Sequence, residues 1–575
     1  MFVIAVSRRP DLSYCPLFHF VLPFNSFQPF VMDVNAYTVG AATLAAFGVY
    51  IATRPGPKPV HQPIDVHCQT VEVDAKEHIR RNASSPGKLL SYHDYHIKTL
   101  YEGFHHGIKQ AGDSNCLGTR TGNGPFVWES YNQVGQRLTN FGSGLVHHGA
   151  KAQSYIGIYS QNRAEWVIAE QACNAYSLIT VPLYDTLGAE TAEFIVDQAQ
   201  IRTIICDPPK LALLLDSAPR MKTLKEIVKM GSVSDKERAD FKAVGVALLS
   251  FAEIEAEGAA KPVPHRPPSP EDVATICYTS GTTGNPKGAM LTHGNFVTDF
   301  RCLDRFLALN KDDVYLSYLP LAHMFERIVQ SGLWPAGAQI GFFRGDVKLL
   351  VEDIAALRPT IFCSVPRLLN RIYDKVVGTV TQAGGVKKFL FDQALASKSA
   401  ELAQGICRRD SIWDKLVFKK VQATLGGRVR VVATGAAPIG GNVLTFLRAA
   451  LGCPVFEGYG QTESSAASTT TVPGDFSVGH VGAPLPCNEI KLADVPDMNY
   501  FSKDNRGEIC FRGANVFRGY LNDKAKTDEA LDSEGWLHSG DIGEWDAERP
   551  GCASLIARSI SFKLGPGRVH CSRED

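Results

Sequence analysis

Apolar and polar positions follow two alternating periods along most of the chain. Short apolar runs such as SYIGIYS (154–160) and ITVPLY (179–184) are typical of buried strands. Between them, NRAEWVIAEQACNAYSL (162–178) has apolar residues three and four positions apart, which predicts a helix. AETAEFIVDQAQ (189–200) and IRTIICD (201–207) continue the order of helix and strand. This alternation predicts an α/β fold built on a parallel, helix-covered sheet.

Three later apolar runs each lead into a glycine-rich loop. VATICY (273–278) is followed by TSGTTGNPKG (279–288). The same arrangement recurs in RVRVVATGAAP (428–438) and in PVFEGYGQTE (454–463). Open α/β sheets bind ligands at the carboxyl ends of their strands. The three loops are therefore candidates for one binding site.

The first of these loops has the composition of a polyphosphate-binding loop. Its glycines can adopt backbone conformations that are unfavourable for other residues, and their backbone N–H groups can donate hydrogen bonds to phosphate oxygens. Lys287 adds a cation. The string does not fit G-x-x-x-x-G-K-[ST], so it is not a Walker A loop. An ordinary surface loop rich in Gly, Ser and Thr is the alternative. The glycines and hydroxyl residues concerned are Gly281, Gly284, Gly288, Thr279, Ser280, Thr282 and Thr283.

Composition narrows the class of protein further. A chain of 575 residues is longer than one compact core usually requires, so two or more domains are expected. Lys+Arg and Asp+Glu are equal at 59 each, which argues against nucleic acid as a partner. The 14 cysteines show no C-x-x-C pair and no zinc-type spacing with histidine. Reduced thiols in a cytosol-facing protein are the expected state.

The N-terminal segment differs from the rest of the chain. AYTVGAATLAAFGVYIA (36–52) contains no charge and precedes the proline-rich TRPGPKP (53–59). Because about 20 apolar residues span a bilayer, this run is at the short end for a transmembrane helix. A membrane anchor, a signal-peptide core and a buried helix are all compatible with it. We favour an anchor within an N-terminal segment 1–57, because the run lies far from Met1 and the cysteines do not look secretory.

Several motifs together resemble those of the AMP-forming adenylating enzymes. TSGTTGNPKG resembles the phosphate-binding signature of that superfamily, and GYGQTE (458–463) resembles its nucleotide and magnesium motif. TGAAP (434–438), RGEICFRG (506–513) and GWLHSGDIGEW (535–545) resemble further motifs of the family, in the family's order. LPLAHMFER (319–327), PLYDTLG (182–188) and VPRLLNRIYDK (365–375) are similar to the long-chain fatty acyl-CoA synthetases, in particular the animal membrane-anchored group.

The resemblance implies a fold, a reaction and a location. It implies a large adenylate-forming domain of helix-covered mixed sheets over residues 58–545. It also implies ATP-dependent activation of a long-chain fatty acid to an acyl-adenylate, which coenzyme A captures as a thioester. The implied partners are the fatty acid, ATP, Mg²⁺, coenzyme A and a membrane. The implied location is the cytosolic face of the endoplasmic reticulum, the mitochondrial outer membrane, or both.

Site residues follow from the motifs by position. The phosphates would be held by Thr279, Ser280, Gly281, Thr282, Thr283, Gly284 and Lys287, with Thr462 on the α-phosphate. Adenosine would be framed by Gly435, Ala436, Ala437, Tyr459 and Gly460, with Asp541 on the ribose hydroxyls. Glu463 would coordinate Mg²⁺, a hard cation that prefers carboxylate oxygen.

Two groups of residues have two interpretations each. His323 and Arg327 are four apart and share one face if their segment is helical. His323 is then either a group beside the acyl carboxylate or the thioester, or a partly buried histidine near a surface arginine. Trp334, Phe342 and Phe343 either line an acyl tunnel or pack in the core.

The resemblance ends at Trp545. The family continues with a sequence like IDRKKHIF into a small mobile C-terminal domain, whereas residues 546–575 here are short, basic and aperiodic. We interpret them as an aberrant tail in place of that domain, such as a displaced reading frame would produce. The chain as written is then expected to bind ATP but to make acyl-CoA slowly. A membrane-anchored nucleotide- and acyl-binding protein, and another acyl-adenylating enzyme, are the alternative functions.

Overall fold

A computed structural model describes residues 5–6, 18–19, 56–184, 188–279, 285–546 and 555–558. The chain divides into two compact units, Met1–Lys58 and Pro59–Asp575. In the first unit, β1 (Ala5–Val6) pairs antiparallel with β2 (Phe18–His19). The predicted anchor, 36–52, lies outside the described residues. Within the residues that are described, none of the helices has the length and apolarity needed to cross a bilayer.

Unit two contains a seven-stranded sheet at whose edge the phosphate loop begins. All neighbouring strands are parallel except β12 and β13, which are antiparallel. The apolar runs of the sequence form its buried centre, as expected for strands covered on both faces. In spatial order the strands are β11 (Ala247–Ser250), β10 (Glu226–Lys229), β9 (Thr203–Cys206), β7 (Tyr155–Tyr159), β8 (Ile179–Leu183), β12 (Val273–Thr279) and β13 (Lys287–Thr292).

A nine-stranded sheet provides the second set of loops. Its central strands, from β18 to β5, are parallel, and antiparallel strands close both edges. In spatial order the strands are β20 (Ala483–Pro484), β19 (Thr469–Thr470), β18 (Val455–Tyr459), β17 (Val431–Thr434), β16 (Ile361–Ser364), β14 (Val314–Ser317), β15 (Gln339–Phe342), β5 (Asn115–Arg120) and β6 (Phe126–Ser130). The predicted strands before TGAAP and GYGQTE are β17 and β18.

A six-stranded antiparallel sheet completes the fold. Its register shifts between β22 and β23, where Glu508 pairs with Ile542 but Cys510 pairs with His538. Residues 555–558, from the predicted tail, form a strand that pairs with β23. In spatial order the strands are β24 (Leu555–Arg558), β23 (Leu537–Trp545), β22 (Arg506–Gly513), β21 (Asn488–Ala493), β4 (Ile79–Asn82) and β3 (Thr70–Asp74). The assignment of 546–575 as a separate tail stays a prediction.

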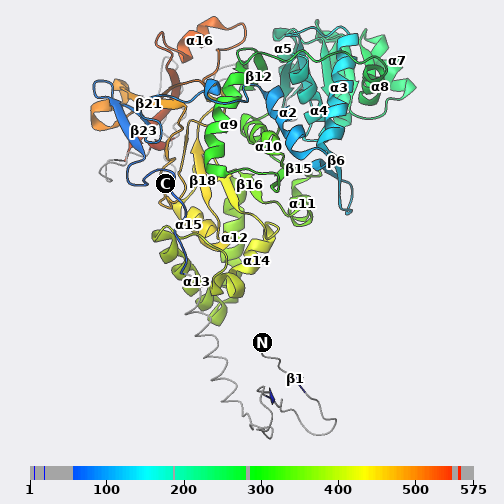
Figure 1. The fold of residues 1–575 in the computed structure, drawn as a ribbon. Helices are drawn as coiled ribbons and strands as arrows, with labels where there is room; N and C mark the ends of the chain where they lie inside the picture. Colours follow the sequence, from blue (N-terminus) through cyan, green and yellow to red (C-terminus); the bar gives the residue numbers. More distant parts are fainter. Residues whose placement is uncertain are drawn as a thin grey trace. The chain divides into compact units, whose positions relative to one another are not determined.

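Helices lie between successive strands and against the sheets (Figure 1). Capping boxes start several of them: Ser130, Ser250 and Thr292 each accept a backbone N–H at the helix start. The helices are α2 (Leu100–Ala111), α3 (Tyr131–His147), α4 (Ala164–Ala175), α5 (Ala189–Gln198), α6 (Leu211–Ser217), α7 (Asp235–Ala243), α8 (Phe251–Ala260), α9 (His293–Leu307), α10 (Met324–Ala336), α11 (Leu350–Leu357), α12 (Pro366–Ala383), α13 (Gly385–Ala403), α14 (Lys419–Thr424), α15 (Gly441–Leu451) and α16 (Lys524–Ala530), with a π-turn η5 (Asp414–Phe418) before α14. The predicted class, an α/β fold of helix-covered mixed sheets, is confirmed.

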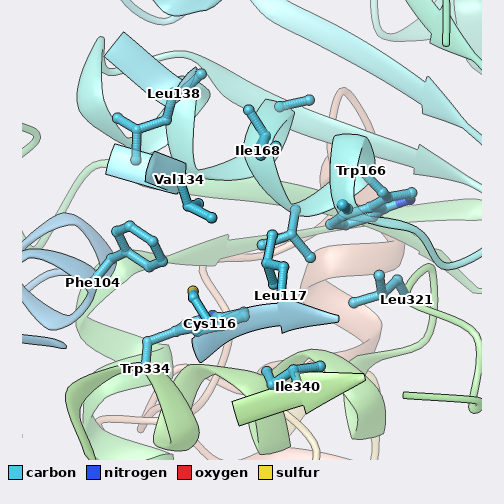
Figure 2. Close-up of a cluster of buried hydrophobic side chains, with 14 of the residues drawn as sticks. Phe104, Cys116, Leu117, Val134, Leu138, Trp166, Ile168, Leu321, Trp334 and Ile340 are labelled. Carbon is cyan, nitrogen blue, oxygen red and sulfur yellow. The ribbon is translucent and has the colours of Figure 1, made fainter. Parts of the chain in front are cut away.

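The largest core cluster settles the interpretation of two aromatic residues. Figure 2 shows Trp334 with Phe104 and Cys116 among side chains from α2, α3, α4 and α10 that pack around β5 and β15. Phe342 belongs to the same buried cluster, and Phe343 packs against a second cluster. Trp334 and Phe342 are therefore core residues, which agrees with one of their two interpretations, whereas Phe343 is only partly buried and its role stays a prediction.

Candidate active site

A cavity of about 620 Å³ lies where β12, β17, β18 and β23 end or begin. Eight of the predicted site residues line it: Thr279, Lys287, His323, Gly435, Ala436, Gly460, Thr462 and Glu463. They come from segments up to about 180 positions apart in the chain, and strand ends bring them to one place. The candidate loops identified in the sequence therefore form one site.

The phosphate loop leaves and re-enters the sheet at adjacent positions. Thr279 is the last residue of β12, Lys287 is the first of β13, and the two are cross-strand partners. Gly288 is required here, because a Cβ at that position would lie 2.7 Å from Cγ2 of Ile276. Residues 280–284, which carry Ser280, Gly281, Thr282, Thr283 and Gly284, lie outside the described part of the chain.

Glu463 is held in place by a residue that the motif analysis missed. The hydroxyl of Tyr520 donates to Oε1 of Glu463 at 2.7 Å, and Nζ of Lys287 lies 5.1 Å from the centre of the Tyr520 ring. Burial, together with the neighbouring Glu463 carboxylate, raises the pKa of Tyr520, so its hydroxyl keeps its proton and remains a donor. Tyr520 lies seven residues beyond the segment RGEICFRG, outside the motifs that the sequence analysis singled out.

Oxygen donors at this end of the cavity fit a hard divalent cation. The buried carboxylate of Glu463 and the hydroxyls of Thr279 and Thr462 all belong to residues that line the cavity. Mg²⁺ prefers one or two carboxylates together with substrate phosphate oxygens. This donor set therefore fits the ion that the motif implies.

The adenosine residues divide into two groups. Gly435 and Ala436 line the cavity, and Ala436 has φ +67°, a left-handed conformation that is costly for alanine and typical of ligand-binding loops. Ala437 is exposed beside them. The hydroxyl of Tyr459 donates to Asp541 at 2.8 Å, next to Gly540, which does line the cavity. Burial raises the pKa of Asp541, and the hydrogen bond from the Tyr459 hydroxyl offsets part of this rise.

His323 lies at the cavity wall, but Arg327 does not. His323 is the N-cap of α10, and its Nδ1 accepts the backbone N–H of Phe325 at 3.2 Å. An accepting Nδ1 leaves the proton of the neutral ring on Nε2. Desolvation lowers the pKa of His323, which favours this neutral form. Arg327 is only 2% exposed and pairs with Glu170, so its description as a surface arginine is wrong.

Apolar residues line one side of the cavity. Six of them come from facing stretches of α9 and α10, which the sequence had not linked to a ligand. The residues are Leu303, Phe306, Leu307, Phe325, Ile328 and Val329. An apolar wall that adjoins a polar loop region suits a ligand with a charged head and a hydrocarbon body.

Comparison with known proteins defines the class. The family of AMP-binding enzymes matches residues 104–521, and the chain therefore belongs to it. Long-chain-fatty-acid–CoA ligase 1 of Cavia porcellus is 47% identical over 560 residues, which cover 94% of this chain and 79% of the relative. Long-chain-fatty-acid–CoA ligase 5 of Mus musculus is 50% identical over 525 residues, covering 89% and 76%. Within the AMP-binding enzymes, the chain is thus a member of the long-chain-fatty-acid–CoA ligase group.

Solved structures show the same fold at low sequence identity. A long-chain-fatty-acid–CoA ligase from Archaeoglobus fulgidus has a TM-score of 0.62 and 19% identity, covering 81% of this chain and 84% of the other. The A domain of a carboxylic acid reductase from Segniliparus rugosus, in complex with AMP, has a TM-score of 0.64 and 21% identity, covering 80% and 74%. These likenesses support the architecture of an adenylate-forming domain.

Proposed function

We propose that this protein activates long-chain fatty acids with ATP and transfers them to coenzyme A. A carboxylate oxygen attacks the α-phosphorus of ATP, pyrophosphate leaves, and a mixed acyl-phosphate anhydride forms. The thiolate of coenzyme A then attacks the acyl carbon and AMP leaves. The observation that carries this proposal is a cavity that joins the phosphate-loop strands to an apolar wall of α9 and α10.

The residues of the polar end have distinct tasks in this proposal. Negative charge moves among phosphate oxygens during the attack, so fixed donors and cations supply most of the stabilisation. Lys287 and the hydroxyls of Thr279 and Thr462 hold the phosphates, and Glu463 holds Mg²⁺ with help from Tyr520. Bound Mg²⁺ supplies charge neutralisation at the phosphates. Asp541, fixed by Tyr459, holds the ribose hydroxyls.

His323 orients the acyl group in this proposal. Its Nδ1 is engaged by Phe325, so the neutral ring offers an Nε2–H donor, and the residue lines the cavity where α10 begins. In our proposal this donor holds one carboxylate oxygen of the fatty acid while the other attacks. His323→Asn would shorten the reach of the donor and should raise KM for fatty acid more than KM for ATP.

Acyl-hydroxamate formation from ATP, palmitate and hydroxylamine tests the first half of the reaction. Glu463→Gln should raise the Mg²⁺ concentration needed for half-maximal rate and lower the rate by about 10²–10³-fold, the usual cost of one well-placed stabilising group. Glu534→Gln, an exposed glutamate between β22 and β23, is the matched control and should change neither. If the Mg²⁺ dependence of Glu463→Gln were unchanged, Glu463 would not be a ligand of the metal ion. The proposed reaction would then be tested by product formation alone.

We also propose that the protein works at a membrane surface. Large apolar side chains are exposed at the start of α13 and on η5: Val386 (74%), Phe389 (62%) and Leu416 (70%). The two elements are adjacent, since the Phe391 and Phe418 rings lie 5.9 Å apart. Exposed lysines lie between these side chains in sequence: Lys387, Lys388 and Lys415. Apolar side chains with lysine around them suit the surface of an anionic bilayer.

Vesicle flotation separates this surface from the predicted anchor at 36–52. Removing residues 1–53 should release most of the protein from membranes, with weaker binding to anionic vesicles remaining. Phe389→Ser with Leu416→Ser should abolish the remaining binding, whereas Val127→Ser, at an equally exposed valine on β6, should preserve it. Equal binding to neutral and anionic vesicles would argue against the lysine contribution.

A further inference from the structure

Three side chains with metal-ligating atoms meet on neighbouring strands of the six-stranded sheet. Glu508 and Cys510 are two positions apart on β22, so they face the same side, and His538 on β23 is the cross-strand partner of Cys510. Nδ1 of His538 lies 2.8 Å from Oε2 of Glu508 and 3.5 Å from Sγ of Cys510. Within the described part of the chain, this is the one group of three or more such side chains with all ligand atoms within 4.8 Å.

These separations are close to those of a tetrahedral zinc site. Bonds of about 2.3 Å to sulfur and about 2.0 Å to nitrogen, at a tetrahedral angle, put the two ligand atoms about 3.5 Å apart. Sγ of Cys510 and Nδ1 of His538 already have this separation. Nitrogen and carboxylate oxygen would stand about 3.3 Å apart on the same ion, so Glu508 needs to withdraw by only about half an ångström.

The chemistry of the cluster also favours a soft divalent cation. A thiolate, an imidazole and a carboxylate are the donors that zinc uses, whereas Mg²⁺ avoids thiolates. A thiolate ligand must be deprotonated, so the ion would displace the thiol proton of Cys510 when it binds.

Two members of the cluster reach the cavity. Cys510 is fully buried, whereas Glu508 and His538 line the cavity already described. Three protein ligands beside a cavity leave a fourth coordination position for water or for a ligand in that cavity. This group lies apart from Glu463, which belongs to the loop after β18 and offers hard oxygen donors.

We propose that Glu508, Cys510 and His538 form a binding site for a zinc-class divalent cation in the wall of the nucleotide cavity. The site contacts the segment 539–541, which carries Asp541. Oε1 of Glu508 accepts the backbone N–H of Gly540 at 2.9 Å, one residue before Asp541. The register shift between β22 and β23 accommodates Ser539, Gly540 and Asp541, so an ion on Glu508 would act on the loop that presents Asp541.

Cobalt(II) binding to the purified, chelator-treated full chain tests the proposal. Cobalt in this site should give the visible bands of a tetrahedral complex and a thiolate-to-cobalt charge-transfer band, with one ion per chain displaced by zinc. Cys510→Ser should abolish the charge-transfer band. His538→Gln should abolish the tetrahedral bands. Cys510→Asp should keep the tetrahedral bands without charge transfer, which separates loss of a ligand from loss of folding.

Two matched variants control for other thiols and histidines. Cys68→Ser removes an exposed cysteine, and His78→Gln removes a histidine whose Nδ1 lies 2.8 Å from Oε1 of Glu72. Both should retain the full cobalt spectrum. The proposal is overturned if the unmodified chain gives no charge-transfer band, or if that band survives in Cys510→Ser. Because the readout is metal binding, it is independent of whether the protein proves to be a ligase.

Discussion

Removing the charge of Arg327 should destabilise the domain severely, because the guanidinium is buried among groups that depend on it. Arg327 and Glu170 are 2% and 6% exposed, and Nε of Arg327 donates to Oε1 of Glu170 at 3.0 Å. Nη1 donates to the hydroxyl of Thr275 at 2.6 Å and Nη2 to that of Thr180 at 3.2 Å. Helix α10 is thereby tied to α4, β8 and the strand β12 that carries the phosphate loop.

The expected cost follows from burial. Arg327→Met leaves the Glu170 carboxylate buried without its cation, and removing one partner of a buried pair costs about 3–5 kcal/mol. Folded domains are typically stable by about 5–15 kcal/mol, so this change removes a large fraction of the total. Glu170→Leu combined with Arg327→Met removes both charges, so the double variant should be less destabilised than the sum of its single variants by about 2–3 kcal/mol.

Equilibrium urea unfolding measures these free energies. Trp166 is a local reporter, since the guanidinium of Arg327 lies 5.7 Å from its ring centre. Arg163→Met is the matched control: Arg163 makes two 2.8 Å contacts with Glu165, but both side chains are partly exposed, so its loss should cost about 0–1 kcal/mol. The reasoning fails if Arg327→Met costs no more than Arg163→Met, or if the double-variant energies are additive.

Three further changes test other parts of the structure. Lys287→Ala should weaken ATP binding by about 1.5–3 kcal/mol, the worth of a charge-assisted contact, in calorimetric titration, whereas Lys524→Ala on exposed α16 should not. Glu326 is fully buried and burial raises its pKa to about 7 from 4.5 in the unfolded chain. The native state therefore holds the proton more tightly than the unfolded chain, so the free energy of unfolding falls by about 3 kcal/mol as pH rises from about 4.5 through 7. Glu326→Gln has no such proton to lose, so urea unfolding from pH 5 to 8 should show a smaller fall in its stability. Gly460→Ala places a Cβ 2.3 Å from the Ala466 carbonyl oxygen, so hydroxamate formation should fall while Gly427→Ala, at a glycine with open space, affects stability only. A Gly460→Ala enzyme with normal activity would contradict the described loop.

Local patterns predicted the strands and their loops well. VATICY was expected as a strand over 273–278, and β12 spans Val273–Thr279. The segments before TGAAP and GYGQTE are β17 and β18. These strands are buried on both faces, so their sequences are continuous apolar runs that end at glycine, and this signal needs no knowledge of distant residues.

Contacts between distant segments were not predictable in the same way. Arg327 and Glu170 are 157 positions apart, and Tyr520 and Glu463 are 57 apart. No periodicity in either segment marks such partners. The helical spacing of His323 and Arg327 was misleading, because His323 caps α10 from outside the helix and turns its ring toward the cavity end, while Arg327 points into the interior.

The sequence did not separate the aromatic residues of the core from those of a ligand cavity. Trp334 and Phe342 could either line an acyl tunnel or pack in the core; they pack in the core, while the apolar side of the cavity uses Leu303, Phe306 and Val329. Both sets are apolar and at helical or strand spacing, so composition alone cannot separate them. What separates them is the direction of each helix face, which only the packing of α9 against α10 decides.

The polar end and the apolar wall of the cavity are built from different parts of the fold. The polar end depends on strand ends and on cross-sheet hydrogen bonds such as Tyr459 to Asp541 and Tyr520 to Glu463. The apolar wall depends on the faces of α9 and α10. Because α10 also carries Arg327, which bonds to Thr275 of β12, the helix that borders the acyl wall is fastened to the strand that leads to the phosphates. The apolar side of the cavity and the strand that ends at Thr279 are therefore held by one buried hydrogen-bond network, so a change to Arg327 should affect both.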